Sequence, residues 1–179
     1  MNPERLLLIS GPIHVGKTTL AKELQDSFGF EKISSSRYLA TLLPADVAND
    51  NERSRKLMQE IGDRLDRQTD FRWLVDEVAS RRIDASPETG SWLIDAVRKP
   101  RQVTHFRSQF QCVRHVHLTA PEGVLRSRHK DTPEHYTQAV LHPNEVSSRS
   151  LGAIADLTLD TTAHSPKDLA LEVVNLWEI

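Results

Sequence analysis

Short runs of hydrophobic residues alternate along the chain with longer stretches in which apolar residues recur at helical spacing. Apolar runs predict strands over residues 5–10 and 92–97, an alternation of apolar residues with Arg and His predicts one over 113–118, and brief strands are expected at 31–33 and 157–160. The runs at 5–10 and 92–97 are almost unbroken by polar residues, a pattern typical of strands buried on both faces. Strands that alternate with helices predict an α/β fold, in which a parallel sheet of about five strands is covered by helices on both faces.

Helical spacing and capping residues define the connecting segments. Helices are predicted over residues 17–28, 36–43, 52–67 and 70–82, and further helices are expected to begin at Pro100, Pro121 and Pro166. Gly29 ends the first helix, because glycine adopts the left-handed conformation without strain. Ser165 and Asp168 form a capping pair around Pro166 at the start of the last helix. A polar region fills residues 127–152, and no element is predicted there.

The composition describes a globular chain that is close to electrically neutral. The 179 residues are room for one domain, and 38% of them are hydrophobic and 27% charged. The formal net charge of −2 excludes a basic coat for nucleic acid or acidic membranes. The basic side is uneven, with 16 arginines against 7 lysines. Because arginine binds phosphates and carboxylates with two parallel hydrogen bonds, this surplus is compatible with a protein that holds small phosphates.

Cysteine usage and hydropathy indicate the compartment. Cys112 is the only cysteine, so the chain has no internal disulfide and no cysteine-based zinc site. His115 and His117 share one face of a predicted strand, but no third metal ligand is evident, and we interpret them as partly buried strand residues. No apolar run is long enough to be a secretory leader or a membrane span. We therefore expect a single cytoplasmic domain over residues 1–179.

The segment after the first predicted strand carries the clearest chemical signal. It fits the pattern G-x-x-x-x-G-K-[ST], with Gly11, Gly16, Lys17 and Thr18 at the fixed positions. The glycines permit a loop whose N–H groups point at one centre, and the following helix adds the positive end of its dipole. Lys17 is expected to reach the β- and γ-phosphates of ATP, and Thr18 to bind Mg²⁺. The predicted nucleotide-binding residues are Gly11, Pro12, Ile13, His14, Val15, Gly16, Lys17, Thr18 and Thr19.

Other classes of phosphate-loop protein fit the sequence less well. A switch GTPase needs a D-x-x-G segment after a later strand and an N-K-x-D segment for guanine. The one D-x-x-G of this chain lies at residues 26–29, at the end of the first helix, and N-K-x-D is absent. The length leaves little room for the extra strands of AAA or transporter ATPases.

Three later stretches are similar to those of nucleoside monophosphate kinases, and most closely to the deoxynucleoside monophosphate kinases of bacteriophages. They are the R-x-x-x-Q-x-x-G-x-x-x-x-R pattern at 55–67, the Asp and Arg of IDAVRKP at 94–100, and HPNE at 142–145 with ADL at 155–157. The resemblance covers most of the chain. It implies a P-loop kinase that uses ATP and Mg²⁺, acts in nucleotide metabolism, holds the acceptor with a helical insertion at about 37–82 and closes a lid at about 126–150.

The positions of the polar residues assign them candidate roles. Asp95 ends a buried strand where ligands bind in open α/β sheets, and we expect it to hold Mg²⁺. Arg98 follows closely and can neutralise charge during phosphoryl transfer. Arg55, Gln59 and Gly62 share one helix face, since they are spaced by four and three residues. That face is expected to meet the acceptor.

Four further arginines complete the predicted site. The resemblance implies that Arg37 contacts the acceptor phosphate and that Arg67 helps to enclose the acceptor. Arg126 and Arg128 lie in the lid region, which is shorter than the lid of adenylate kinases. Because they are two residues apart, they point in different directions on a helix, and either one is a candidate for the transferring phosphate.

The predicted reaction is ATP-dependent transfer of a phosphoryl group to a nucleoside or deoxynucleoside monophosphate. One alternative is a kinase for another small acceptor, such as dephospho-coenzyme A or a metabolite that is not a nucleotide. A second is a nucleotide-binding regulator without turnover. The expected partners are small nucleotides, without nucleic acid or membrane, and the sequence leaves monomer and homodimer both open.

Overall fold

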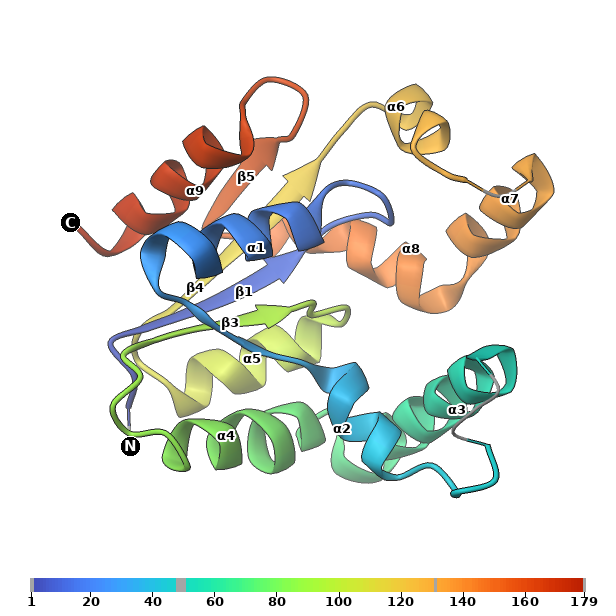
Figure 1. The fold of residues 1–179 in the computed structure, drawn as a ribbon, viewed down its shortest axis with the longest axis horizontal. Coiled ribbons are helices and arrows are strands. Elements are labelled where there is room, and N and C mark those ends of the chain that lie inside the picture. The colour runs from blue at the N-terminus through green and yellow to red at the C-terminus, as the bar shows by residue number, and fades with distance from the viewer. Residues whose placement is uncertain (1, 48–50, 131, 179) are drawn as a thin grey trace.

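Five parallel strands form the central sheet of a computed structural model that describes residues 2–47, 51–130 and 132–178 (Figure 1). The strands lie in the order β2-β3-β1-β4-β5, so that β1 is central. Their bounds are Arg5–Ser10 (β1), Glu31–Ile33 (β2), Ser91–Asp95 (β3), Val113–Thr119 (β4) and Leu157–Asp160 (β5). The predicted α/β fold with a parallel five-stranded sheet is therefore confirmed.

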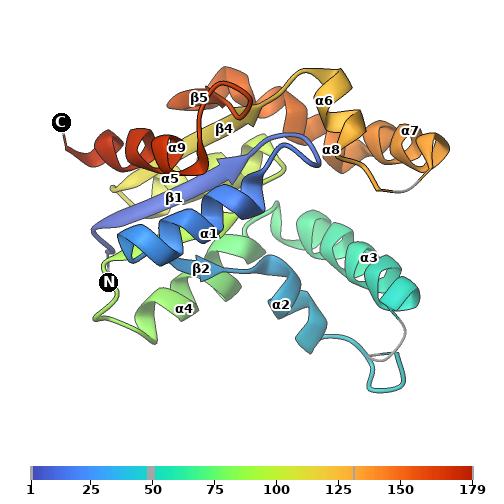
Figure 2. The same cartoon turned by 45° about the horizontal axis from the view of Figure 1, so that its top comes forward.

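Helices connect the strands and cover both faces of the sheet (Figures 1 and 2). Their bounds are Lys17–Phe28 (α1), Ser35–Thr41 (α2), Asn51–Thr69 (α3), Leu74–Ser80 (η1, a π-helix), Arg81–Asp84 (α4), Pro100–Gln109 (α5), Glu122–Ser127 (α6), Pro133–Leu141 (α7), Pro143–Arg149 (α8), Ser150–Ile154 (η2), Pro166–Val174 (α9) and Asn175–Trp177 (η3). Within these described ranges, no helix is both long and apolar enough to span a membrane.

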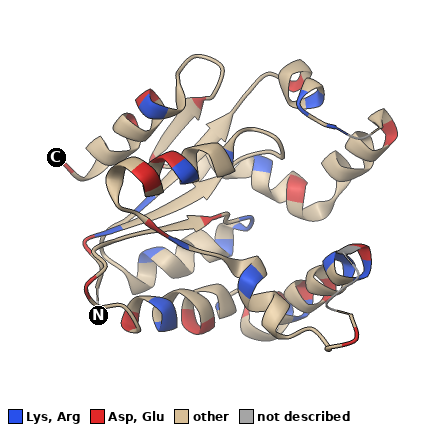
Figure 3. Cartoon of the chain, viewed as in Figure 1, with Lys and Arg blue, Asp and Glu red and all other residues tan. Residues whose placement is uncertain are grey.

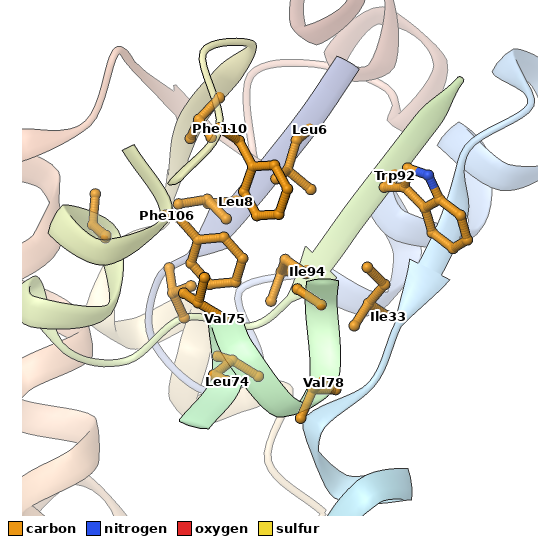
Figure 4. Close-up of a cluster of buried hydrophobic side chains, with 14 of the residues drawn as sticks. Leu6, Leu8, Ile33, Leu74, Val75, Val78, Trp92, Ile94, Phe106 and Phe110 are labelled. Atoms are coloured by element: carbon orange, nitrogen blue, oxygen red, sulfur yellow. The ribbon is translucent and has the colours of Figure 1, made fainter. Parts of the chain in front are cut away.

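Two apolar clusters, one on each face of the sheet, explain the unbroken run of β1. Leu6 and Leu8 point to the face that is covered by η1, α4 and α5, where Trp92 and Phe106 are also buried (Figure 4). Leu7 and Ile9 point to the other face, which α1 and α9 cover. Alternate residues of a strand point to opposite faces, so a strand that is buried on both must be apolar throughout.

The polar region at 127–152 contains helices that the sequence did not predict. Its α7 and α8 are short and largely exposed, and each buries only a few side chains, such as Tyr136 in α7 and Ser148 in α8. Both helices begin with a proline that follows a capping residue. The capping residues are Thr132 and His142, whose side chains accept hydrogen bonds from N–H groups of the first turn. With so few apolar positions, the helical period is too weak to recognise.

The predicted elements at 36–43, 52–67 and 113–118 differ from the observed ones by one or two residues at their ends, and two others differ more. The helix predicted at 70–82 begins later, as η1 and α4, because Asp70 and Phe71 adopt positive φ angles of 49° and 65° after α3 has ended at Thr69. The strand predicted at 92–97 ends at Asp95, and the backbone N–H of Val97 instead donates to the carbonyl of Ile9. The regular pairing of β3 with β1 therefore stops at Asp95, beside the phosphate loop.

A buried serine links the two histidines of β4. Ser10 Oγ lies 2.7 Å from His115 Nε2 and 2.8 Å from His117 Nδ1. Burial lowers the pKa of both histidines, to about 4 for His115. Within the described ranges, no group of three or more His, Cys, Asp or Glu side chains could hold a metal ion. The interpretation of both histidines as strand residues is confirmed, and their burial is nearly complete.

The neutral His115 is expected to make the fold sensitive to acid. Its pKa is about 4 in the folded chain, against about 6.5 when unfolded, so the unfolded state binds an extra proton between these values. Stability is therefore lost as the pH falls from 6.5 towards 4, by roughly 2 kcal/mol at pH 5 and roughly 3 kcal/mol in full. Urea unfolding at pH 7 and pH 5 measures this difference.

His115→Gln should reduce that pH dependence by roughly 2 kcal/mol. His164→Gln, which alters an exposed histidine, should leave it close to that of the unmodified chain. Equal pH dependence of the two variants would contradict the prediction.

Candidate active site

The phosphate loop joins β1 to α1 at the carboxyl ends of the strands (Figure 2). Gly11 and Gly16 adopt φ angles of 137° and 104°, a region that other residues rarely occupy. A Cβ atom at Gly11 would lie 2.5 Å from the carbonyl oxygen of Leu118 in β4, so a side chain has no room there. The loop is therefore packed against the sheet, and both glycines are required by its shape.

Lys17 begins α1 and its side chain turns back over the loop. Its Nζ donates to the carbonyl oxygens of Gly11 at 2.8 Å and Pro12 at 2.6 Å. Burial lowers the pKa of Lys17 to about 8, and the carboxylates of Glu145 and Asp95 oppose this shift. At neutral pH the ammonium group remains mostly charged, so the loop carries a cation where an anionic phosphate would bind.

Helix α8 holds the loop from the outside. Glu145 accepts a hydrogen bond from the backbone N–H of Ile13 at 2.9 Å, and Ser148 Oγ donates to the carbonyl of Gly11 at 3.0 Å. Arg149 Nε donates to the same Glu145 oxygen at 3.0 Å. In the sequence this segment was recognised only by its HPNE motif, and its contacts with the phosphate loop were not predicted.

Asp95 ends β3 directly beside the phosphate-loop strand, in register with Ile9 of β1. Its carboxylate is nearly buried, and Lys32 Nζ on β2 donates to Oδ2 at 2.6 Å. Lys32 was missed as a site residue. The other carboxylate oxygen and the Thr18 hydroxyl are hard oxygen donors of the kind that Mg²⁺ accepts alongside water and phosphate oxygens. The residues present thus fit the predicted metal.

Two adjoining cavities open beside these residues. The first, here called the α3 cavity, has a volume of about 250 Å³ and is lined by Arg55, Gln59, Gly62, Trp73 and Arg98 among others. The second, the loop cavity, has a volume of about 470 Å³ and is lined by Gly11, Lys17, Arg98, His135 and Glu145 among others. Both are lined by Gln59, Ala96, Arg98 and Asn144. The two cavities therefore share part of their wall, and the space beside Lys17 adjoins the space beside α3.

The α3 cavity brings together part of the predicted acceptor site. Arg55, Gln59 and Gly62 do share one face of α3, and that face lines the cavity. Arg37 and Arg67 are exposed and are not among the lining residues of either cavity. The roles of these two arginines stay predictions.

Trp73 and Asp66 also line the α3 cavity. From the sequence Trp73 was interpreted as a core residue, and it is almost buried, whereas Asp66 was not predicted as a site residue. Trp73 Nε1 donates to Asp66 Oδ1 at 2.7 Å, and the ring of Tyr38 stacks on Trp73 with centroids 5.8 Å apart. Burial raises the pKa of Asp66. The cavity thus combines an aromatic wall with a carboxylate, and the one signal in the sequence was the position of Trp73 shortly after the 55–67 motif.

The two candidate lid arginines have different surroundings. The Arg126 guanidinium lies over the ring of Tyr136, 5.8 Å from its centroid. Arg128 Nη1 donates to the carbonyls of His14 at 3.2 Å and Val15 at 3.4 Å, so Arg128 contacts the phosphate loop. It also lines a cavity of about 400 Å³ on the far side of the loop, which is lined by His14, Val15, Gly16, Thr19, Leu20, Thr161, His164, Pro166 and Leu169.

Charged residues show no segregation by sign along the helices that carry the site. Basic and acidic residues are interspersed along α1 and α3 (Figure 3). The exposed pair of Lys22 and Asp26 on α1 is one example. The positive charge of the site therefore comes from individual residues such as Lys17, rather than from a basic surface.

The sequence matches one protein family over most of its length. The model of the family AAA_18, described as AAA domain, matches residues 7–146. No curated protein matches the chain.

Solved structures resemble the whole fold. A sugar kinase from Janibacter sp. HTCC2649 aligns with a TM-score of 0.55 and 18% identity, over 98% of this chain and 95% of that one. A shikimate kinase from Aquifex aeolicus aligns with a TM-score of 0.53 and 14% identity, over 97% and 96%. A tunicamycin resistance protein from Deinococcus radiodurans aligns with a TM-score of 0.52 and 17% identity, over 98% and 95%. At such identities the likeness establishes the fold alone.

Proposed function

This chain belongs to the AAA_18 family, described as AAA domain, and from its site we propose that it transfers the γ-phosphoryl group of ATP to a small acceptor. The observation that carries the proposal is the pair of adjoining cavities, whose shared wall includes Arg98 and Gln59. One cavity contains Lys17 and the phosphate loop, and the other contains the polar face of α3. A donor and an acceptor can therefore meet at Arg98. The sugar and shikimate kinases that share the fold support a kinase.

The loop and its neighbours supply positioning and charge. The backbone N–H groups of the loop and the Lys17 ammonium bind the β- and γ-phosphates. Thr18 and Asp95 would hold Mg²⁺, which neutralises charge on these phosphates when bound. Arg98 stabilises the charge of the moving phosphoryl group as its bond to the acceptor oxygen forms and its bond to ADP breaks. We place the nucleoside of ATP in the cavity beside Arg128 in this proposal, because that cavity of about 400 Å³ adjoins the phosphate loop at His14, Val15 and Gly16.

A nucleoside or deoxynucleoside monophosphate is the acceptor that we propose. The α3 cavity offers Arg55 for a phosphate group and Gln59 for the polar edge of a base. Leu39, Met58 and Trp73 provide the apolar surface that a planar base requires. Gly62 permits close approach, since it carries no side chain.

A second acceptor class is favoured by one specific feature of the same cavity. Asp63 and Asp66 both line it, and carboxylates accept hydrogen bonds from sugar or polyol hydroxyls. Such a site suits a metabolite that is not a nucleotide, and it would explain the fold shared with sugar and shikimate kinases.

A coupled assay of ADP release separates these proposals. The purified chain is given ATP and Mg²⁺ with each nucleoside and deoxynucleoside monophosphate, and in parallel with hydroxylated metabolites and dephospho-coenzyme A. ADP release with a nucleoside monophosphate is expected. Release only with an acceptor that is not a nucleotide would overturn the choice of acceptor, and nucleotide binding without any release would favour the regulator.

Arg55→Ala is expected to raise the KM for the acceptor by about 10- to 100-fold, because it removes a charge-assisted hydrogen bond to the acceptor phosphate. The KM for ATP should change little, since Arg55 does not line the loop cavity. Steady-state kinetics with each substrate varied in turn measures both values.

Arg64→Ala is the matched control on α3, because Arg64 is exposed and lines neither cavity. Equal effects of Arg55→Ala and Arg64→Ala would contradict the assignment of the cavity. Arg37→Ala and Arg67→Ala, assayed in the same way, decide the two acceptor roles that stay predictions.

A further inference from the structure

Glu145 is an almost buried carboxylate at the outer side of the phosphate loop, with 7% of its surface exposed. It accepts the backbone N–H of Ile13 at 2.9 Å, and Arg149 Nε one turn later donates to the same oxygen at 3.0 Å. A buried charge is costly unless it is paired and hydrogen-bonded. Both conditions are met here, and one of the two partners is the loop itself.

The hydrogen bonds from α8 fix both kinds of backbone group in the loop. Glu145 holds an N–H, at Ile13, and Ser148 holds a carbonyl, at Gly11. These two side chains are three residues apart, so they lie on one face of α8. The start of α8 is fixed in turn by His142, whose Nδ1 accepts the N–H of Asn144 at 3.2 Å. The HPNE segment thus caps the helix and anchors the loop.

The same network reaches the lid region. Arg149 Nη1 donates to Glu122 of α6 at 2.9 Å, and Glu122 also accepts the hydroxyl of Tyr136 of α7 at 2.6 Å. The helices α6, α7 and α8 follow one another beside the loop (Figure 1). Glu145 is therefore one of the points at which this group of helices meets the phosphate loop, together with Ser148 and Arg128, and it is the one that bonds a loop N–H through a buried carboxylate.

We propose that Glu145 is a positioning residue for nucleotide binding, which acts by holding the backbone of Ile13 so that the loop N–H groups converge on one centre. Backbone donors bind a phosphate strongly only when they are already oriented, because ordering them on binding costs free energy. The inference rests on the proposed function only in taking the ligand to be a nucleotide. The competing explanation is structural, with Glu145 serving to neutralise Arg149.

Two substitutions of Glu145 distinguish these explanations. Glu145→Gln removes the charge but keeps a carbonyl oxygen that can accept the Ile13 N–H, whereas Glu145→Ala removes both. Positioning predicts that ADP binds to Glu145→Gln within about threefold of the unmodified affinity, and to Glu145→Ala at least about tenfold more weakly. Neutralisation predicts that the two variants are equally impaired. Isothermal titration of the full chain with ADP gives the affinities, and Glu134→Gln, on the exposed surface of α7, is the matched control.

A double variant covers the case in which Glu145→Ala unfolds. Glu145→Ala with Arg149→Ala removes both members of this ion pair, so it is expected to be more stable than Glu145→Ala alone, while the N–H of Ile13 still lacks its carboxylate partner. Weak ADP binding by a stable double variant supports the positioning role. Recovery of the unmodified affinity would overturn it.

Hydrogen exchange of the loop amides tests the proposal without any nucleotide. The amides of Gly11 and of residues 13–16 should exchange at least about tenfold faster in the Glu145→Ala variants than in the unmodified chain, and at close to the unmodified rate in Glu145→Gln. If the unmodified chain binds no ADP, the proposed function fails, and this exchange pattern still decides the role of Glu145. Unchanged exchange in the Glu145→Ala variants would overturn it.

Discussion

Replacing Lys17 with alanine is expected to lower phosphoryl transfer by roughly 10³-fold while the chain remains folded. The ammonium group is the cation of the phosphate loop, and it would contact the phosphates whose charge rises during transfer. Its present partners are two loop carbonyls, those of Gly11 and Pro12. Because these partners are uncharged, removal of the ammonium group leaves no carboxylate without a salt-bridge partner. The sheet and its apolar clusters are also untouched.

The measurement is the rate of ADP release at saturating acceptor, with circular dichroism and thermal unfolding to verify the fold. Lys22→Ala is the control on the same helix, since Lys22 is exposed and pairs with Asp26. It should keep full activity. Full activity of Lys17→Ala would refute the assignment of the phosphate loop.

The phosphate loop and several strands could be predicted because their signals are local. The strands at 5–10, 31–33 and 157–160 have the predicted bounds. In each of them the residues that predict the strand lie within a few positions of one another. The phosphate-loop motif can likewise be recognised from its immediate neighbours in the sequence, because a strand precedes it and a helix follows it.

The contacts that complete the site could not be predicted, because they join residues that are distant in the sequence. Lys32 and Asp95 are 63 positions apart, and Ile13 and Glu145 are 132 apart. No period or motif in a single chain encodes such pairs. The order of the strands decides them, since β2 and β3 are neighbours and the connection after β4 returns α8 to the loop.

The arginine surplus proved to be only partly a property of the site. Arg55 and Arg98 line the α3 cavity and Arg128 contacts the loop. Arg149, which was not predicted, forms ion pairs with Glu122 and Glu145. The number of arginines could suggest phosphate binding, but the packing of α3 and α8 decides which arginines reach the candidate phosphate-binding site.

The family description stands beside the expectation that the length leaves little room for the extra strands of AAA ATPases. The AAA domain family matches residues 7–146, from the phosphate loop to α8. The argument against AAA ATPases concerned additional strands, and the sheet formed by residues 2–47, 51–130 and 132–178 has five. The family match therefore includes most of this five-stranded sheet, and the likeness to the sugar and shikimate kinases concerns the fold of nearly the whole chain.

Arg98→Ala is expected to lower kcat by roughly 10²- to 10³-fold while the dissociation constant for ATP changes only a few-fold. Arg98 lines both cavities, at the boundary that the phosphoryl group would cross in the proposed reaction. Its backbone N–H donates to Gln102 Oε1 at 2.9 Å, so the start of α5 fixes where its side chain originates. A guanidinium in this position gains most when charge spreads over the moving phosphoryl oxygens, and so it acts on the transition state more than on bound ATP.

Steady-state kinetics together with direct titration of ATP separates the two effects. Arg101→Ala is the control at the start of α5, because Arg101 is exposed, pairs with Asp70 and lines neither cavity. Arg98→Lys should recover only part of the rate, since an ammonium group keeps the charge but loses the two-pronged geometry. Equal losses in kcat and ATP affinity on Arg98→Ala would assign Arg98 to ground-state binding. The boundary between the cavities would then hold the phosphates without accelerating their transfer, because binding that is equal in the ground and transition states does not raise kcat.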